Sequence, residues 1–220
     1  MLLRLDPEIL ILLIPALVFS LCVHEFAHGI IAYNLGDDTA YRQGRLTLNP
    51  LKHLDPIGSL MLLFIGFGYA KPVPVNPLNL SNPRKDMIKV AAAGPLSNLL
   101  LALLGTFLKF SIYYFFAFAA NETTGTFIHI FIQINIFLAI FNLLPIHPLD
   151  GGQIFGNIIS KYNSDLAQKL NIYGPNILMG LILIGMVSGF SIIGLFIEPI
   201  YFLIKNMFDI FVKLLLSIFI

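Results

Sequence analysis

The sequence predicts an all-α polytopic membrane protein, and three observations support this fold class. Hydrophobic residues make up 57% of the 220 residues and charged residues only 11%, whereas a soluble domain carries about 25% charged residues. The mean hydropathy is +0.85. Apolar runs long enough to cross a bilayer recur along the chain. Because so few polar side chains cannot cover a molecular surface, we expect the surface to face lipid.

The apolar runs indicate about five to six transmembrane helices. Pro95 suits the first turn of the second run. In the last run Lys205, Asp209 and Lys213 share one helical face at i, i+4 and i+8, so this segment either spans the membrane or lies in the interface plane. The long runs comprise residues 9–35, 95–120, 127–144, 173–197 and 200–220.

Residues 57–80 predict a re-entrant or extended segment. Residues 57–70 are apolar but too short to cross a bilayer. The sequence KPVPVNPLNLSNP follows, and its prolines exclude a helix and favour an extended path. Non-helical backbone inside a membrane is tolerated only against protein or beside a water-filled cavity, so we expect such a cavity here.

The basic residues predict the orientation. Nine of the thirteen lysines and arginines lie in residues 36–56, 71–89 and 161–169, and the linker 121–125 has none. The positive-inside tendency places the three basic loops on the cytoplasmic side of the cell membrane and the N-terminus outside. The net charge of +1 gives no reason to expect a nucleic-acid partner. No polar stretch is long enough to fold alone, so we expect one integral-membrane domain over residues 1–220.

The stretch LCVHEFAHGII places two histidines and a glutamate within the first apolar run. Residues i and i+4 share a helical face, so His24 and His28 offer two imidazoles to one ion. Glu25 lies about 100° around the helix from His24, close enough to act on a water beside the metal. This H-E-x-x-H pattern is typical of zinc proteases, whose glutamate is the general base. The alternative is that the three groups only form hydrogen bonds between helices, which would bury polar groups at considerable cost.

Catalytic zinc usually takes three protein ligands, so the pattern requires a third one elsewhere. Asp150, in NLLPIHPLDGG, follows a helix that runs from the outside inward and therefore returns to the depth of the histidines. Pro145 and Pro148 break that helix, and the two glycines after Asp150 allow close backbone approach. An ordinary helix-capping aspartate is the alternative. Cys22 faces about 200° away from His24, and we interpret it as a packing residue.

Three motifs in order, HEFAH, AAAGPLSN and NLLPIHPLDGG, resemble those of the site-2 protease family of intramembrane zinc metalloproteases. The segments LNPLKHLDPIGS and KPVPVNPLNLSNPRKDM are similar to its compact branch, which lacks appended PDZ and CBS domains. The resemblance covers most of the chain up to the DGG motif. It implies that His24, His28 and Asp150 bind one Zn²⁺ per chain and that Glu25 is the catalytic base.

Two further polar residues have open roles. Asn98, at the end of AAAGPLSN, either donates its amide to a developing oxyanion as a catalytic residue or joins helices by packing and hydrogen bonding. His147 stands where relatives commonly have proline. It lines the cavity, hydrogen-bonds Asp150, or competes for zinc.

The sequence thus predicts a zinc metalloendopeptidase that hydrolyses peptide bonds within or near transmembrane segments of membrane-protein substrates. We expect a catalytic core of three helices over about residues 9–155 and C-terminal helices over about residues 173–220. The alternative is a non-proteolytic zinc-binding membrane protein that holds partner helices. Glu25 disfavours that alternative, because a glutamate that need not bind metal has no role in it.

Overall fold

The computed structural model describes residues 6–65, 68–116 and 121–218. Helices dominate these ranges, which contain no β-strand, only an isolated antiparallel bridge between Leu54 and Ala70. The predicted all-α fold class is therefore confirmed. In chain order the helices are α1 (Pro7–Asn34), α2 (Thr39–Arg42), α3 (Pro50–His53), α4 (Pro56–Ile65), the 3₁₀ turn η2 (Pro77–Asn79), α5 (Pro83–Phe115), α6 (Glu122–Asn142), α7 (Asp150–Ile159), α8 (Ser164–Ser188) and α9 (Ile192–Leu216).

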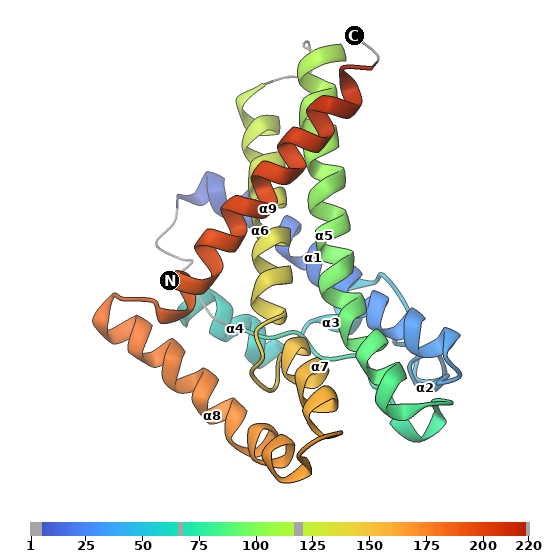
Figure 1. The fold of residues 1–220 in the computed structure, drawn as a ribbon. Coiled ribbons are helices and arrows are strands. Elements are labelled where there is room, and N and C mark those ends of the chain that lie inside the picture. The colour runs from blue at the N-terminus through green and yellow to red at the C-terminus, as the bar shows by residue number, and fades with distance from the viewer. Residues whose placement is uncertain (1–5, 66–67, 117–120, 219–220) are drawn as a thin grey trace.

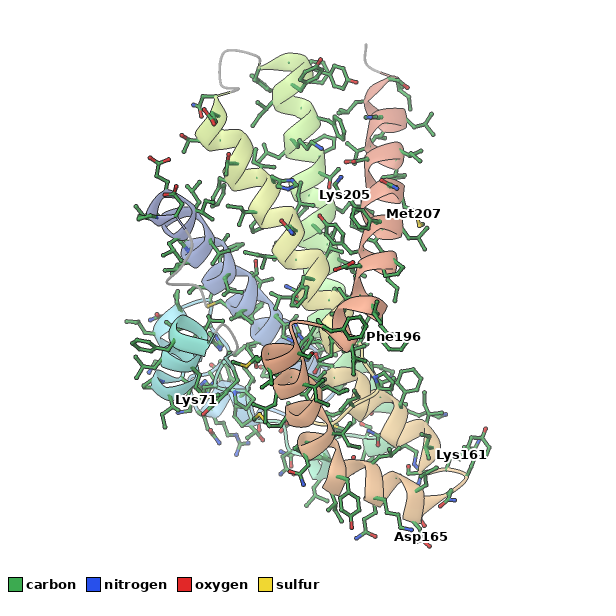
Figure 2. The ribbon with its side chains drawn as sticks, turned by 90° about the vertical axis from the view of Figure 1, so that its left-hand side faces the viewer. Lys71, Lys161, Asp165, Phe196, Lys205 and Met207 are labelled. Atoms are coloured by element: carbon green, nitrogen blue, oxygen red, sulfur yellow. The ribbon has the colours of Figure 1, made fainter. Side chains whose placement is uncertain are left out.

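Within the described residues, four helices are long and apolar enough to cross a membrane: α1, α5, α6 and α8. The protein is thus a multi-pass membrane protein. Helix α9 is as long as α8 but carries four charged residues where α8 carries two. Asp209 of α9 lies 3.6 Å from Nζ of Lys109 in α5 and 4.0 Å from Nζ of Lys205, so the charged face of α9 packs beside α5 (Figures 1 and 2).

Three predicted helix boundaries are wrong. Helix α8 begins at Ser164 rather than at residue 173, so most of the predicted basic loop 161–169 is helical. Helix α5 begins at Pro83 rather than at Pro95, because Asn82 caps its N-terminus by accepting from the Lys85 N–H. Pro95 therefore lies inside the helix. The apolar run 173–197 is interrupted because α8 ends at Ser188, and Gly189 caps it with a φ of +71° that suits a residue without a side chain. The Ser191 hydroxyl accepts from the Gly194 N–H and begins α9.

The helices α1, α5 and α6 pack against one another, and α7 packs against α5 (Figure 1). The buried apolar cluster lies mainly on one face of α6, at a spacing of four residues. Its members are Ala102, Ile128, Ile132, Ile136, Ile140 and Ile197. Polar side chains of α1, α5 and α6 meet where these three helices contact one another, and the candidate site lies there.

The predicted re-entrant segment consists of the short helix α4 followed by an extended chain. The Lys71 N–H donates to the His53 carbonyl over 2.7 Å, next to the Leu54–Ala70 bridge. His53 is itself buried, with Nε2 2.7 Å from the Thr47 carbonyl, so it orders this loop. The extended path predicted from the prolines is confirmed.

The extended chain is also fixed at its far end. Asp37, fully buried just after α1, accepts from the Asn76 N–H (2.7 Å) and the Asn79 side-chain amide (2.8 Å). Burial raises the pKa of Asp37, but hydrogen bonds from Thr39, Asn79 and Asn76 outweigh it and hold that pKa below its usual value. An ionised carboxylate thus ties the extended chain to the end of α1.

Candidate metal centre

Three side chains that the sequence assigned to a metal lie together. Helix α1 places His24 and His28 on one face, and their Nε2 atoms are 3.1 Å apart. Asp150 is the first residue of α7, and its carboxylate oxygens lie 3.2 Å from Nε2 of His24 and 3.3 Å from Nε2 of His28. All three residues are buried. Among the described residues they form a cluster with the composition of a metal site.

The tautomer of His28 follows from its second contact. Its Nδ1 lies 2.7 Å from the backbone carbonyl of Val90 in α5. A carbonyl oxygen only accepts hydrogen bonds, so Nδ1 carries the proton. In the neutral ring Nε2 therefore presents a lone pair to the cluster.

The tautomer of His24 follows from a longer chain of hydrogen bonds. The Asn135 side-chain amide donates to the Phe131 carbonyl over 2.9 Å, which fixes which end of this amide is nitrogen. Its oxygen therefore accepts from Nδ2 of Asn98 at 2.9 Å. The Asn98 oxygen then faces Nδ1 of His24 at 2.6 Å, so that this ring nitrogen donates. The Nε2 atom of His24 also carries a lone pair.

This network joins three helices at one buried point. Asn98 of α5 and Asn135 of α6 are fully buried. The Asn135 amide also donates to the Ser20 hydroxyl of α1 over 2.8 Å, and Ser20 donates to the Ala16 carbonyl. Every member has a partner, as a buried polar network requires. The network holds the His24 ring at a set angle.

With both imidazoles neutral, two lone pairs and a carboxylate thus converge with no proton donor among them. The Oδ2 atom of Asp150 is buried without a hydrogen-bond partner among the described residues. Such an arrangement is stable only around a positive charge. With zinc–nitrogen and zinc–oxygen bonds of about 2.0–2.1 Å, ligand atoms at a tetrahedral site are about 3.3 Å apart. The candidate ligand atoms of the three residues lie 3.1–3.3 Å apart, in agreement with that geometry. The Nδ1–H of His24 donates to a side-chain amide oxygen and that of His28 to a backbone carbonyl. Zinc-binding histidines usually donate their second ring N–H to such an acceptor.

Small residues let α5 approach the two imidazoles. A Cβ atom added at Gly94 would lie 2.5 Å from Cε1 of His24 and 2.5 Å from Nε2 of His28. Only glycine fits at this distance. The run AAAGP therefore brings backbone against the cluster, a role of small residues in membrane helix packing that sequence reasoning missed.

The loop before α7 delivers Asp150. Gly151 and Gly152 pack against backbone of the preceding loop, since added Cβ atoms would lie 2.2 Å from the Leu143 carbonyl oxygen and 2.5 Å from the His147 nitrogen. The close approach predicted for these glycines is present. His147 stands outside the metal cluster found among the described residues. Burial lowers its pKa.

Glu25, next to the first histidine on α1, is buried and hydrogen-bonded to the extended chain. Its Oε2 accepts from the Val73 N–H over 2.8 Å. This contact between HEFAH and KPVPV was absent from the sequence prediction. It fixes the glutamate beside the cluster, where a carboxylate can exchange protons with a bound reactant.

Fold and site together define a multi-pass membrane protein with a buried candidate cation site, made of two histidines of α1 and one aspartate of α7. Comparison with known proteins agrees with this class. Residues 109–186 match the model of peptidase family M50. The protein named "Putative zinc metalloprotease YwhC" from Bacillus subtilis is 47% identical over 150 residues, covering 67% of this chain and 68% of that protein.

A second relative is more distant. "Putative zinc metalloprotease Rip2" from Mycolicibacterium smegmatis is 34% identical over 148 residues, covering 65% of this chain and 55% of that protein. No solved structure matches. The chain belongs to peptidase family M50, which confirms the resemblance to the site-2 proteases, and zinc is the metal that this family implies.

Proposed function

We propose that the protein is an intramembrane zinc metalloprotease that hydrolyses peptide bonds within or near transmembrane segments of membrane proteins. One observation carries the proposal. Three buried acceptor atoms converge without a donor, and a buried glutamate follows the first of them on the same helix. Relatives named zinc metalloproteases support the same class of reaction.

Each site residue has a distinct proposed role. His24, His28 and Asp150 hold the zinc, which when bound acidifies water and polarises the scissile carbonyl as a Lewis acid. Glu25 accepts the proton of the attacking water and returns it to the leaving amine. Asn98 positions the His24 ring through its side-chain oxygen. Its earlier assignment to an oxyanion stays a prediction, and its amide hydrogens are engaged by Asn135 and the Ser20 carbonyl.

The extended chain next to Glu25 is a proposed guide for substrate. A helical substrate hides its carbonyls in internal hydrogen bonds, so it must unwind before hydrolysis. In an extended chain, the N–H and C=O groups of residues i and i+2 point to the same edge, so Val73 and Val75 share the edge that faces Glu25. An unwound substrate would add a strand along this edge through the groups other than the Val73 N–H, which donates to Glu25. Proline in the paired substrate residues would then block cleavage.

The proposed location is the cell membrane, with the site toward the cytoplasmic side. The argument is the concentration of lysine and arginine in residues 36–56, 71–89 and 161–169. The substrate would accordingly enter laterally from the bilayer as a transmembrane segment.

Cleavage and metal binding need separate tests. The chain, purified in detergent, would be assayed for zinc content and for cleavage of a model transmembrane substrate. We expect Glu25→Gln to keep about one zinc per chain and to lose cleavage by about 10²- to 10⁴-fold, the usual contribution of a general base. Wild type that holds zinc and cuts none of several transmembrane substrates would instead favour a zinc-binding protein that only holds partner helices.

A further inference from the structure

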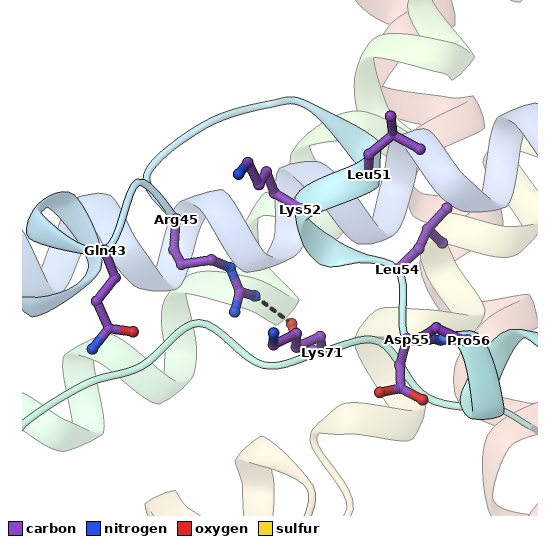
Figure 3. A pocket seen from close by; sticks show the side chains of 8 residues that line it. All are labelled: Gln43, Arg45, Leu51, Lys52, Leu54, Asp55, Pro56 and Lys71. Carbon is purple, nitrogen blue, oxygen red and sulfur yellow. Dashed lines mark hydrogen bonds between the residues drawn. The ribbon is translucent and has the colours of Figure 1, made fainter.

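A second site lies beside the extended chain, outside the metal cluster. It is a pocket of about 400 Å³ between the loop after α2, helix α3 and the start of the extended chain (Figure 3). Its lining residues are Gln43, Arg45, Leu51, Lys52, Leu54, Asp55, Pro56 and Lys71.

Arg45 is the unusual member of this lining. Only 8% of its surface is exposed. Its guanidinium donates to the carbonyls of Lys71 (2.8 Å) and Pro72 (3.2 Å), while its buried Nε has no hydrogen-bond partner among the described residues. No carboxylate described in the structure lies within 4.0 Å of it. Buried charges are normally paired, so the positive charge of Arg45 lacks a counter-ion.

The other charges of the pocket add to this imbalance. Lys52 and Lys71 also form no ion pair with a described carboxylate, and Figure 3 shows both residues around the same pocket as Arg45, which donates to the Lys71 backbone carbonyl. Asp55, the one acidic residue among those that line the pocket, accepts a hydrogen bond from the Gly58 N–H over 2.8 Å. Three cations against one carboxylate give the pocket a positive potential that attracts an anion.

The surroundings of the pocket indicate which anion fits. Leu51 lines it with 80% of its surface exposed, and Ile57 and Leu60 of the adjoining helix α4 are 64% and 54% exposed. Exposed apolar side chains in a membrane protein face acyl chains. A ligand with an anionic head and apolar tails would fit both the positively charged pocket and the exposed apolar side chains beside it.

We propose that this pocket binds the phosphate headgroup of an anionic phospholipid, with the acyl chains against Leu51 and α4. Arg45 and Lys71 contact the phosphate from the inner side, and Lys52 contacts it from α3. Basic side chains at a cytoplasmic membrane surface are suited to such lipids.

The bound lipid would act on the metal site through the extended chain. Lys71 precedes Val73 by two residues, at most about 7 Å of extended chain, and the Val73 N–H holds Glu25. A headgroup that neutralises Arg45 and Lys71 would fix this segment and with it the glutamate. This coupling rests on the proposed function, whereas the binding of lipid does not.

The binding test uses the full-length Glu25→Gln chain in neutral detergent, so that its result is independent of peptidase activity. Dissociation constants for short-chain phosphatidylglycerol, short-chain phosphatidylcholine and inorganic phosphate would be measured by calorimetry. The variant Lys52→Gln/Lys71→Gln is compared with Arg84→Gln/Lys85→Gln, which removes the same charge from exposed residues outside the pocket.

We expect phosphatidylglycerol to bind at least tenfold more tightly than phosphatidylcholine. The pocket variant should weaken phosphatidylglycerol binding about 30-fold, from the usual contribution of two basic side chains at an anionic lipid, and the control by less than threefold. Equal losses in both variants would overturn the proposal, since the attraction would then be non-specific. Inorganic phosphate that binds as tightly as phosphatidylglycerol would overturn the assignment to a lipid.

Discussion

Replacing Asn98 by alanine tests the network that holds the His24 ring. The substitution removes the 2.6 Å hydrogen bond from Nδ1 of His24 and leaves the Asn135 oxygen without its donor. Loss of such an outer partner weakens zinc binding 10- to 100-fold, which corresponds to about 1.4–2.7 kcal/mol. The free energy of unfolding should fall by about 1–3 kcal/mol in addition, because a buried acceptor is left unsatisfied.

The matched control is Asn135→Ala. It removes a similar buried amide with its hydrogen bonds to Ser20, Phe131 and Asn98, but it leaves the Asn98 oxygen in place to accept from Nδ1 of His24. We expect a similar loss of stability and a change in zinc affinity below about threefold.

The assay for both variants is competition for zinc against a chelator of known affinity, paired with thermal unfolding. Unchanged zinc affinity in Asn98→Ala would refute the deduced protonation of His24. An equal loss of affinity in both variants would show that stability, rather than ring orientation, controls zinc binding.

Three other substitutions give further predictions. Gly94→Ala should lower zinc occupancy sharply, measured by elemental analysis of folded protein, because its Cβ would lie 2.5 Å from the His24 ring; full occupancy would contradict the close approach of α5. Asp209→Asn should lower the thermal stability by about 1 kcal/mol through loss of its pairing with Lys109, and leave zinc content unchanged. Asp37→Asn should destabilise the protein at neutral pH. Because the pKa of Asp37 is lowered in the folded protein, its carboxylate stabilises the fold above the ordinary carboxyl pKa of about 3.9, and this stabilisation is lost as the pH falls through the folded pKa. The unfolding curves of variant and wild type should therefore converge at that low pH. A difference in stability that stays constant with pH would exclude an ionised Asp37.

The sequence predicted those features that depend on neighbouring residues along the chain, or on how deep in the bilayer a residue must lie after a membrane-spanning helix. Spacing in HEFAH places His24 and His28 on one face, and the chain that follows α6 brings Asp150 back to them. The prolines of KPVPV exclude a helix, which left an extended chain. These inferences need only helical periodicity and the thickness of a bilayer.

Other features depend on partners that a single sequence does not indicate. A buried asparagine such as Asn98 accepts or donates equally well, and only the fixed orientation of Asn135 decides that it accepts from His24. The boundary between α8 and α9 was predicted at residues 198–199 instead of at Gly189–Ser191, because hydrophobicity continues through the true break, although Gly189 and Ser191 are ordinary cap residues. A closer reading of caps would have found this break.

X-ray absorption at the zinc edge tests the central claim most directly, because it reports the ligands of the metal irrespective of activity. For the purified wild-type chain we predict one zinc with nitrogen or oxygen neighbours at about 2.0–2.1 Å and the multiple scattering of two imidazoles, and for Asp150→Ala a marked loss of metal. A sulfur neighbour at about 2.3 Å, or full zinc retention in Asp150→Ala, would contradict the assignment of His24, His28 and Asp150.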